Sequence, residues 1–148
     1  MKVDIVYWDD NIGKTIKKLT VDAEPFGIQV GMRAEWQMVV ADEDKEVKEG
    51  KMVPIRIKSI VIPERAIALP CFFMRHALGI VESLTSIGKP RLVEMERKVT
   101  HALFYPIQDG IIHEGELLSV INVFPAAIEE PLPNREAIYR WMERRYSD

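Results

Sequence analysis

Two short segments far apart in the chain, "VKEGKMVPI" and "IHEGELLSV", share one pattern. Each starts with a branched apolar residue, has Glu-Gly two positions later and continues into a run of apolar residues. When Gly50 is aligned with Gly115, the apolar positions stay in phase and Asp44 falls on Asp109. Glycine readily takes the positive φ angles of tight chain reversals, and a neighbouring glutamate keeps such a turn in water. The pattern therefore predicts two chain reversals, each joining the strands of a hairpin, with structural rather than catalytic glutamates.

Alternating apolar and polar residues predict strands in the first third of the chain. Residues 2–8 and 14–22 alternate on either side of the turn-forming segment "DDNIG", which is typical of a hairpin. The even positions from Met32 to Val40 are apolar and share one face, which indicates a further strand.

Residues 52–63 predict a second long strand, with Val53, Ile55 and Ile57 on one face. Pro54 interrupts this strand and has no amide hydrogen to donate to a neighbour. We therefore expect the strand to lie at a sheet edge or to carry a bulge at Pro54.

The segment "RLVEMERKVTHALFYP" (91–106) fits both a helix and a strand. The helical template places Leu92, Met95, Val99, Ala102 and Leu103 on one face, whereas the extended template places there Val93, Met95, Val99, Leu103 and Tyr105. β-branched and aromatic residues favour the strand, and the charged run from 94 to 98 favours the helix. We interpret the segment as a strand because it leads directly into the second Glu-Gly turn.

The C-terminus predicts an amphipathic helix over residues 134–148. Asn134 is a suitable N-cap, and Ile138, Trp141 and Met142 form an apolar stripe at helical spacing. The stripe is expected to pack on the domain or on a second subunit. The predicted fold is therefore one mainly β domain over residues 1–133, a small antiparallel barrel or barrel-sandwich with two related hairpin-containing halves, followed by this helix.

Composition and charge narrow the range of partners. The net charge of -3 gives no reason to expect nucleic acid or an anionic membrane surface, and no apolar run is long enough to cross a bilayer. Cys71 is the only cysteine, so no internal disulfide forms, and the N-terminus has no export signal. We expect a cytoplasmic protein, and a homo-oligomer because isologous dimers are the commonest assemblies.

Two pairs of polar residues interrupt apolar segments and are the candidate ligand-binding residues. Arg75 and His76 lie within the apolar stretch 66–81, and Arg97 and His101 lie on the apolar face of the strand predicted over 91–106. Such groups reach water, find partners such as Glu64, or line a pocket, because burying them unpaired is costly. An arginine beside a histidine binds carboxylate or phosphate and handles a proton.

Two functions agree with these residues. The first is a non-catalytic binding or assembly module for a small anionic ligand or a protein partner. The alternative is a small enzyme in which His76 or His101 acts as general acid–base while Arg75 or Arg97 orients an anionic substrate. The chain contains no known catalytic motif, so the catalytic residues stay unassigned.

The sequence predicts neither a metal nor another cofactor. The spacing of His76, His101 and His113 matches no short zinc motif, and the chain has no Gly-rich phosphate loop. We expect no cofactor attached to Lys45, which follows Asp44 on the approach to a glycine turn.

Two resemblances extend this interpretation. The turns in "VKEGKMVPI" and "IHEGELLSV" resemble those of lipoyl/biotinyl-type barrel-sandwich domains, which implies a β-barrel architecture. The order "IPERAIALPCFFMRHALGIV", "RLVEMERKVTHAL" and "DGIIHEGELLSVI" resembles an archaeal conserved family known only as domains of unknown function. This second resemblance covers about residues 32–124 and implies an archaeal cytoplasmic protein, with no activity attached to it.

Overall fold

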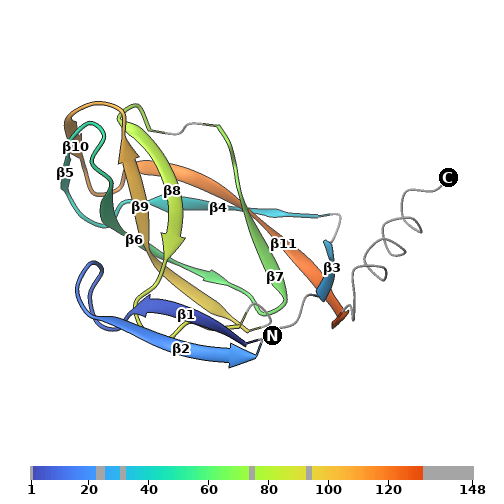
Figure 1. Ribbon diagram of the computed structural model, residues 1–148. Helices are drawn as coiled ribbons and strands as arrows, with labels where there is room; N and C mark the ends of the chain where they lie inside the picture. Colours follow the sequence, from blue (N-terminus) through green and yellow to red (C-terminus); the bar gives the residue numbers. More distant parts are fainter. Residues whose placement is uncertain (1, 23–25, 31–32, 74–75, 93–94, 132–148) are drawn as a thin grey trace.

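A computed structural model describes residues 2–22, 26–30, 33–73, 76–92 and 95–131 (Figure 1). These residues form strands and contain no helix, which confirms the predicted mainly β class. The strands are β1 (Lys2–Trp8), β2 (Ile16–Asp22), β3 (Phe26–Val30), β4 (Glu35–Val40), β5 (Lys45–Val47), β6 (Val53–Ile62), β7 (Ala66–Pro70), β8 (Gly79–Thr85), β9 (Arg97–Pro106), β10 (Gly110–Ile112) and β11 (Leu117–Pro131). The predicted helix over 134–148 lies outside the described residues, and so does Arg75.

The strands form antiparallel sheets in which β9 and β11 are the central strands. One sheet has the order β6-β9-β8, and a second has the order β3-β11-β4 with β7 also paired to β11. The short strands β5 and β10 pair with each other, and β1 and β2 form the predicted N-terminal hairpin. Figure 1 shows the long strand β11 crossing the molecule beside β4 and β7, with the β1–β2 hairpin at one side. No helix of the described residues is long and apolar enough to span a membrane.

Both Glu-Gly segments form tight turns, as predicted. Gly50 and Gly115 have φ values of 70° and 89°, in the region that favours glycine. Each turn is closed by a hydrogen bond across four residues, from Lys51 N–H to Lys48 O at 3.0 Å and from Glu116 N–H to His113 O at 3.1 Å. The expectation that each turn closes a hairpin is wrong, because β5 pairs with β10 and β6 pairs with β9.

Each turn is held by the segment that precedes the other turn. The backbone N–H of Glu49 donates a hydrogen bond to the Asp109 carboxylate, with N and Oδ1 2.8 Å apart. The backbone N–H of Glu114 donates to the Asp44 carboxylate, also at 2.8 Å. The glycines repeat the arrangement: Gly50 N–H donates to the Pro106 carbonyl at 2.9 Å and Gly115 N–H to the Ala41 carbonyl at 2.8 Å. The aligned aspartates of the two segments therefore anchor each other's turns, which stabilises the β5–β10 pairing.

The core lies between the two larger sheets. Ile55 and Ile57 of β6 are buried on the predicted face, and β6 lies at a sheet edge, as Pro54 required. A register irregularity follows between Arg56 and Ile60, after which Ile60 and Ile62 face the core instead. The core consists of Val39, Ala41, Val47, Ile55, Ile57, Ile60, Ile62, Ala66, Val99, Ala102, Phe104, Ile112, Leu118, Ile121 and Val123.

The strand predicted from the even positions before residue 41 forms, but the opposite face meets the core. Val39 and Ala41 are fully buried, whereas Trp36 and Met38 are 72% and 65% exposed. Odd positions at the end of this strand are also apolar, so the alternation of residues did not show which face is buried. The register of pairing with β11 determines which face meets the core. The expected homo-oligomer stays a prediction.

Residues 97–106 form a strand, which confirms the extended interpretation over the helical one. Of the predicted face, Val99 is buried, whereas Met95 and Tyr105 are exposed. The next buried residues after Val99 are Ala102 and Phe104, which belong to the opposite face. Both neighbouring strands show register irregularities along β9, and a one-residue change in phase moves every later side chain to the other face.

Candidate functional site

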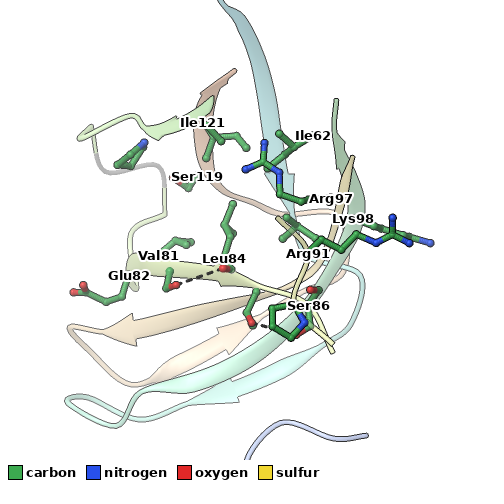
Figure 2. Close-up of a pocket in the computed structure, with 16 residues that line it drawn as sticks. Ile62, Val81, Glu82, Leu84, Ser86, Arg91, Arg97, Lys98, Ser119 and Ile121 are labelled. Carbon is green, nitrogen blue, oxygen red and sulfur yellow. Dashed lines mark hydrogen bonds between the residues drawn. The ribbon is translucent and has the colours of Figure 1, made fainter. Parts of the chain in front are cut away.

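A pocket of about 460 Å³ lies between the two larger sheets (Figure 2). Its volume is in the range of small-molecule sites. Strands β6, β7, β8, β9 and β11 line it, together with residues that connect β8 to β9. Its apolar lining residues are Ile62, Ala68, Pro70, Val81, Leu84, Pro90, Val99 and Ile121. Its charged lining residues are Glu82, Arg91, Arg97 and Lys98.

A second pocket of about 380 Å³ adjoins the first. Ser86, Arg91, Arg97 and Lys98 line both pockets, so the two share a cationic wall. The remaining lining residues of this second pocket are Ile87, Lys89, Thr100 and His101. We call the first pocket the apolar chamber and the second the cationic pocket.

Arg97 is held in place between two sheets. It is the first residue of β9, and one terminal guanidinium nitrogen, Nη2, donates a hydrogen bond to the carbonyl oxygen of Ala66 at the start of β7. Its side chain is partly buried, and Figure 2 shows it beside Ile62 at the pocket wall. This anchorage positions a permanent positive charge where the two pockets meet.

His101 lies in the cationic pocket with its charge state biased toward neutral. Desolvation lowers the pKa of His101 below its ordinary value of 6.5, and the nearby cations Arg56 and Lys45 lower it further, while Glu43 opposes them. The Thr100 hydroxyl lies 2.9 Å from the Nδ1 atom of His101. At neutral pH the imidazole is therefore uncharged and offers a hydrogen-bond donor or acceptor rather than a cation.

His76 lies away from both pockets and belongs to a separate hydrogen-bonded pair. Its Nδ1 accepts the backbone N–H of Leu78 at 3.2 Å, so Nε2 carries the hydrogen and donates to the Glu116 carboxylate at 2.9 Å. The ring also makes an edge contact with Phe104, with centroids 6.0 Å apart. These contacts tie the segment before β8 to the second Glu-Gly turn, which is a structural role.

The Glu116 pair predicts a defined acid sensitivity. The backbone N–H of His113, and then the side chain of His76, hold the pKa of Glu116 below its ordinary value of 4.5. Because the unfolded state then binds more protons, the stability contributed by this carboxylate is present above about pH 4.5 and is lost as pH falls through the lower folded pKa. We expect Glu116→Gln to cost about 0.5 kcal/mol at pH 7, since solvent screens the partly exposed pair.

Urea unfolding at a series of pH values measures this effect. The free energy of unfolding of Glu116→Gln should fall less steeply below pH 4.5 than that of the unsubstituted protein. The control is Glu114→Gln, an exposed neighbour in the same turn. If the free energy of unfolding fell equally steeply below pH 4.5 in the unsubstituted protein and in Glu116→Gln, the role assigned to this carboxylate would be wrong.

The structure brings together two of the four predicted binding residues. Arg97 and His101 line the cationic pocket, His76 lies elsewhere, and Arg75 is outside the described residues. Sequence reasoning missed Arg91 and Lys98, although the stretch "KPRLVEMERK" is rich in cations. Arg91 lies in the β8–β9 connection and Lys98 lies in β9. The sequence does not show that the two side chains line the same pocket, and only the structure does.

Metal binding has no support in the described part of the chain. There, no group of three His, Cys, Asp or Glu side chains is arranged to hold a metal ion. The expectation of a protein without metal or other cofactor stays a prediction.

Comparison with known proteins identifies a family and a relative whose functions are not described. The profile of the family described as "Domain of unknown function DUF22" matches residues 2–110. The chain is 30% identical over 119 residues to "Uncharacterized protein MJ0614" of Methanocaldococcus jannaschii, covering 79% of this chain and 89% of that protein. No solved structure matches the chain with significance.

Proposed function

This chain belongs to the DUF22 family of domains of unknown function, and from that premise we propose that it is a binding module for a small anionic ligand. The family agrees with the archaeal family of unknown function that the sequence resembled. The family description names no activity, so the proposal rests on the site itself.

The observation that carries the proposal is the cationic wall shared by the two pockets. Arg91, Arg97 and Lys98 line both, and Lys89 adds a fourth cation to one of them. Guanidinium groups bind carboxylate and phosphate oxygens through two parallel hydrogen bonds, and lysine adds a point charge. Solvent screens the partly buried Arg97 less than a charge on an open surface, whereas Lys89, Arg91 and Lys98 are exposed.

The enzyme alternative now depends on His101. Arg97 and His101 share the cationic pocket, as an acid–base mechanism with an oriented anion requires, whereas His76 is engaged by Glu116. We prefer the binding function to the enzyme because anion binding requires only positive charge and hydrogen-bond donors, which the cationic wall provides. Turnover of a small anionic substrate that is abolished by His101→Asn would favour the enzyme instead.

The proposal predicts weak, localised binding of simple anions. Titrating the full chain with inorganic phosphate or acetate should shift the backbone amide NMR signals of residues 86–101 in a saturable, salt-sensitive manner. Lys98→Ala should weaken the affinity about threefold, the amount expected for a partly screened charge.

A matched lysine provides the control. Lys58 is exposed on a strand, as Lys98 is, but lines neither pocket. Lys58→Ala should therefore leave the affinity unchanged. Equal weakening by the two substitutions would show that only overall charge matters, and absence of saturable shifts at 86–101 would remove the proposal.

A further inference from the structure

The two adjoining pockets differ in chemistry beyond their shared cationic wall. The apolar chamber is lined by three buried residues from three different strands, Ile62, Val99 and Ile121. Val81 and Leu84 of β8 line the same chamber and are partly buried. Their apolar surface is available to a molecule that enters between the sheets, and covering it is favourable.

Most of the polar groups along β8 in the chamber are directed to the backbone rather than to the space between the sheets. The Ser83 hydroxyl donates to the Leu84 carbonyl at 3.4 Å, and the Thr85 hydroxyl donates to the Ser86 carbonyl at 3.3 Å (Figure 2). The chamber therefore presents mainly carbon surface, whereas the cationic pocket presents charge.

The charges of the chamber are separated by sign. Figure 2 shows Arg91 and Lys98 on one side of the pocket and Glu82 on the opposite side. Glu82 is exposed, and its carboxylate points away from the other labelled side chains, so only the cationic side offers groups that bind an anion (Figure 2). The arrangement accommodates one anionic end, directed toward the cations.

We propose that the ligand is an amphiphilic anion: one carboxylate or phosphate head bound in the cationic pocket, and an apolar chain or ring that occupies the chamber between the sheets. This inference rests on the proposed anion-binding function and specifies its substrate class. The head contacts Arg91, Arg97 and Lys98, while the apolar body covers Val81 and Leu84. Such ligands combine the orienting polar contacts and the large apolar contact area that are common in small-molecule sites.

A series of simple probes tests the inference on the full chain. Acetate and octanoate share the head and differ in the body, while octylamine keeps the body and reverses the charge. Titration calorimetry with monomeric probe should give octanoate an affinity at least about tenfold higher than acetate, because additional methylene groups are buried. Octylamine should not bind at the site.

A substitution within the chamber tests the contribution of the apolar body to the affinity separately from that of the anionic head. Ala68 lines the apolar chamber but not the cationic pocket, and Ala68→Leu reduces the space there. It should weaken octanoate about tenfold and leave acetate unchanged. Ala77→Leu, at an exposed position outside both pockets, is the control and should change neither affinity.

The outcomes distinguish this inference from the function on which it rests. If acetate binds and octanoate binds no more tightly, the amphiphilic ligand is excluded while anion binding stands. If neither acid binds, or if octylamine binds as well as octanoate, the anion-binding function itself is wrong. The comparison of probes on the unsubstituted protein decides the matter even if Ala68→Leu does not fold.

Discussion

Phe104→Ala is expected to lower the free energy of unfolding by about 3–5 kcal/mol, the range for removing a fully buried aromatic side chain. Phe104 is 0% exposed and lies in β9, the central strand of its sheet. It pairs with Val53 of β6 on one side and Val81 of β8 on the other, and its ring contacts the edge of His76. The vacated volume is bordered by paired strands that resist collapse, so a cavity remains.

Urea unfolding followed by tryptophan fluorescence measures this loss. The control is Tyr105→Ala, the next residue of the same strand, whose side chain is 38% exposed. It should cost less than about 2 kcal/mol, because much of its surface is already in water. Comparable losses for the two substitutions would show that β9 does not present alternate residues to core and solvent at this point.

Gly79→Ala is expected to destabilise the protein by about 3 kcal/mol or more, at the upper end for an added methyl group. Gly79 begins β8 and pairs with Pro106 of β9. A Cβ there would overlap the carbonyl oxygen of Tyr105 and lie 2.8 Å from Cα of Pro106 and 2.8 Å from the Phe104 ring. Two of these obstacles are backbone, so relief requires the strands to separate and weakens their pairing.

A second glycine substitution isolates this steric effect. Gly115→Ala introduces a methyl group with nothing within 4 Å, but at a φ of 89°. Its expected cost is therefore only the unfavourable backbone conformation, about 1–2 kcal/mol. Thermal or urea unfolding should rank Gly79→Ala as the more damaging substitution, and the reverse order would contradict the close approach of β8 to β9.

The candidate site was predicted in part. Arg97 and His101 were identified because polar residues on an apolar strand need a partner or a pocket. His76 met the same criterion, yet its partner is Glu116, far along the chain and in a turn that sequence analysis treated as structural. A polar residue among apolar ones thus indicates that a partner exists, but it does not distinguish a structural partner from a ligand.

The face of each strand was harder to predict than its existence. Alternation correctly indicated strands before residue 41 and over β6, and the proline argument placed β6 at an edge. Alternation assigned Trp36 and Met38 to the buried face, which is wrong, because both faces of the strand carry apolar residues near Val39. Alternation also assigned the wrong buried face to the end of β9. A register irregularity between β6 and β9 changes which residues face the core, and such irregularities depend on the partner strand.

The amino-acid sequence by itself determined the β class and the two glycine turns, because backbone preference and period-two alternation are properties of neighbouring residues. Only the tertiary structure decided that β5 pairs with β10, that Asp44 and Asp109 anchor each other's turns, and that Arg91, Arg97 and Lys98 share one wall. The strand pairing and the anchored turns join residues far apart in the chain, and the shared wall depends on how the β8–β9 connection packs beside β9. Their positions follow from strand register and sheet packing, which no local pattern encodes.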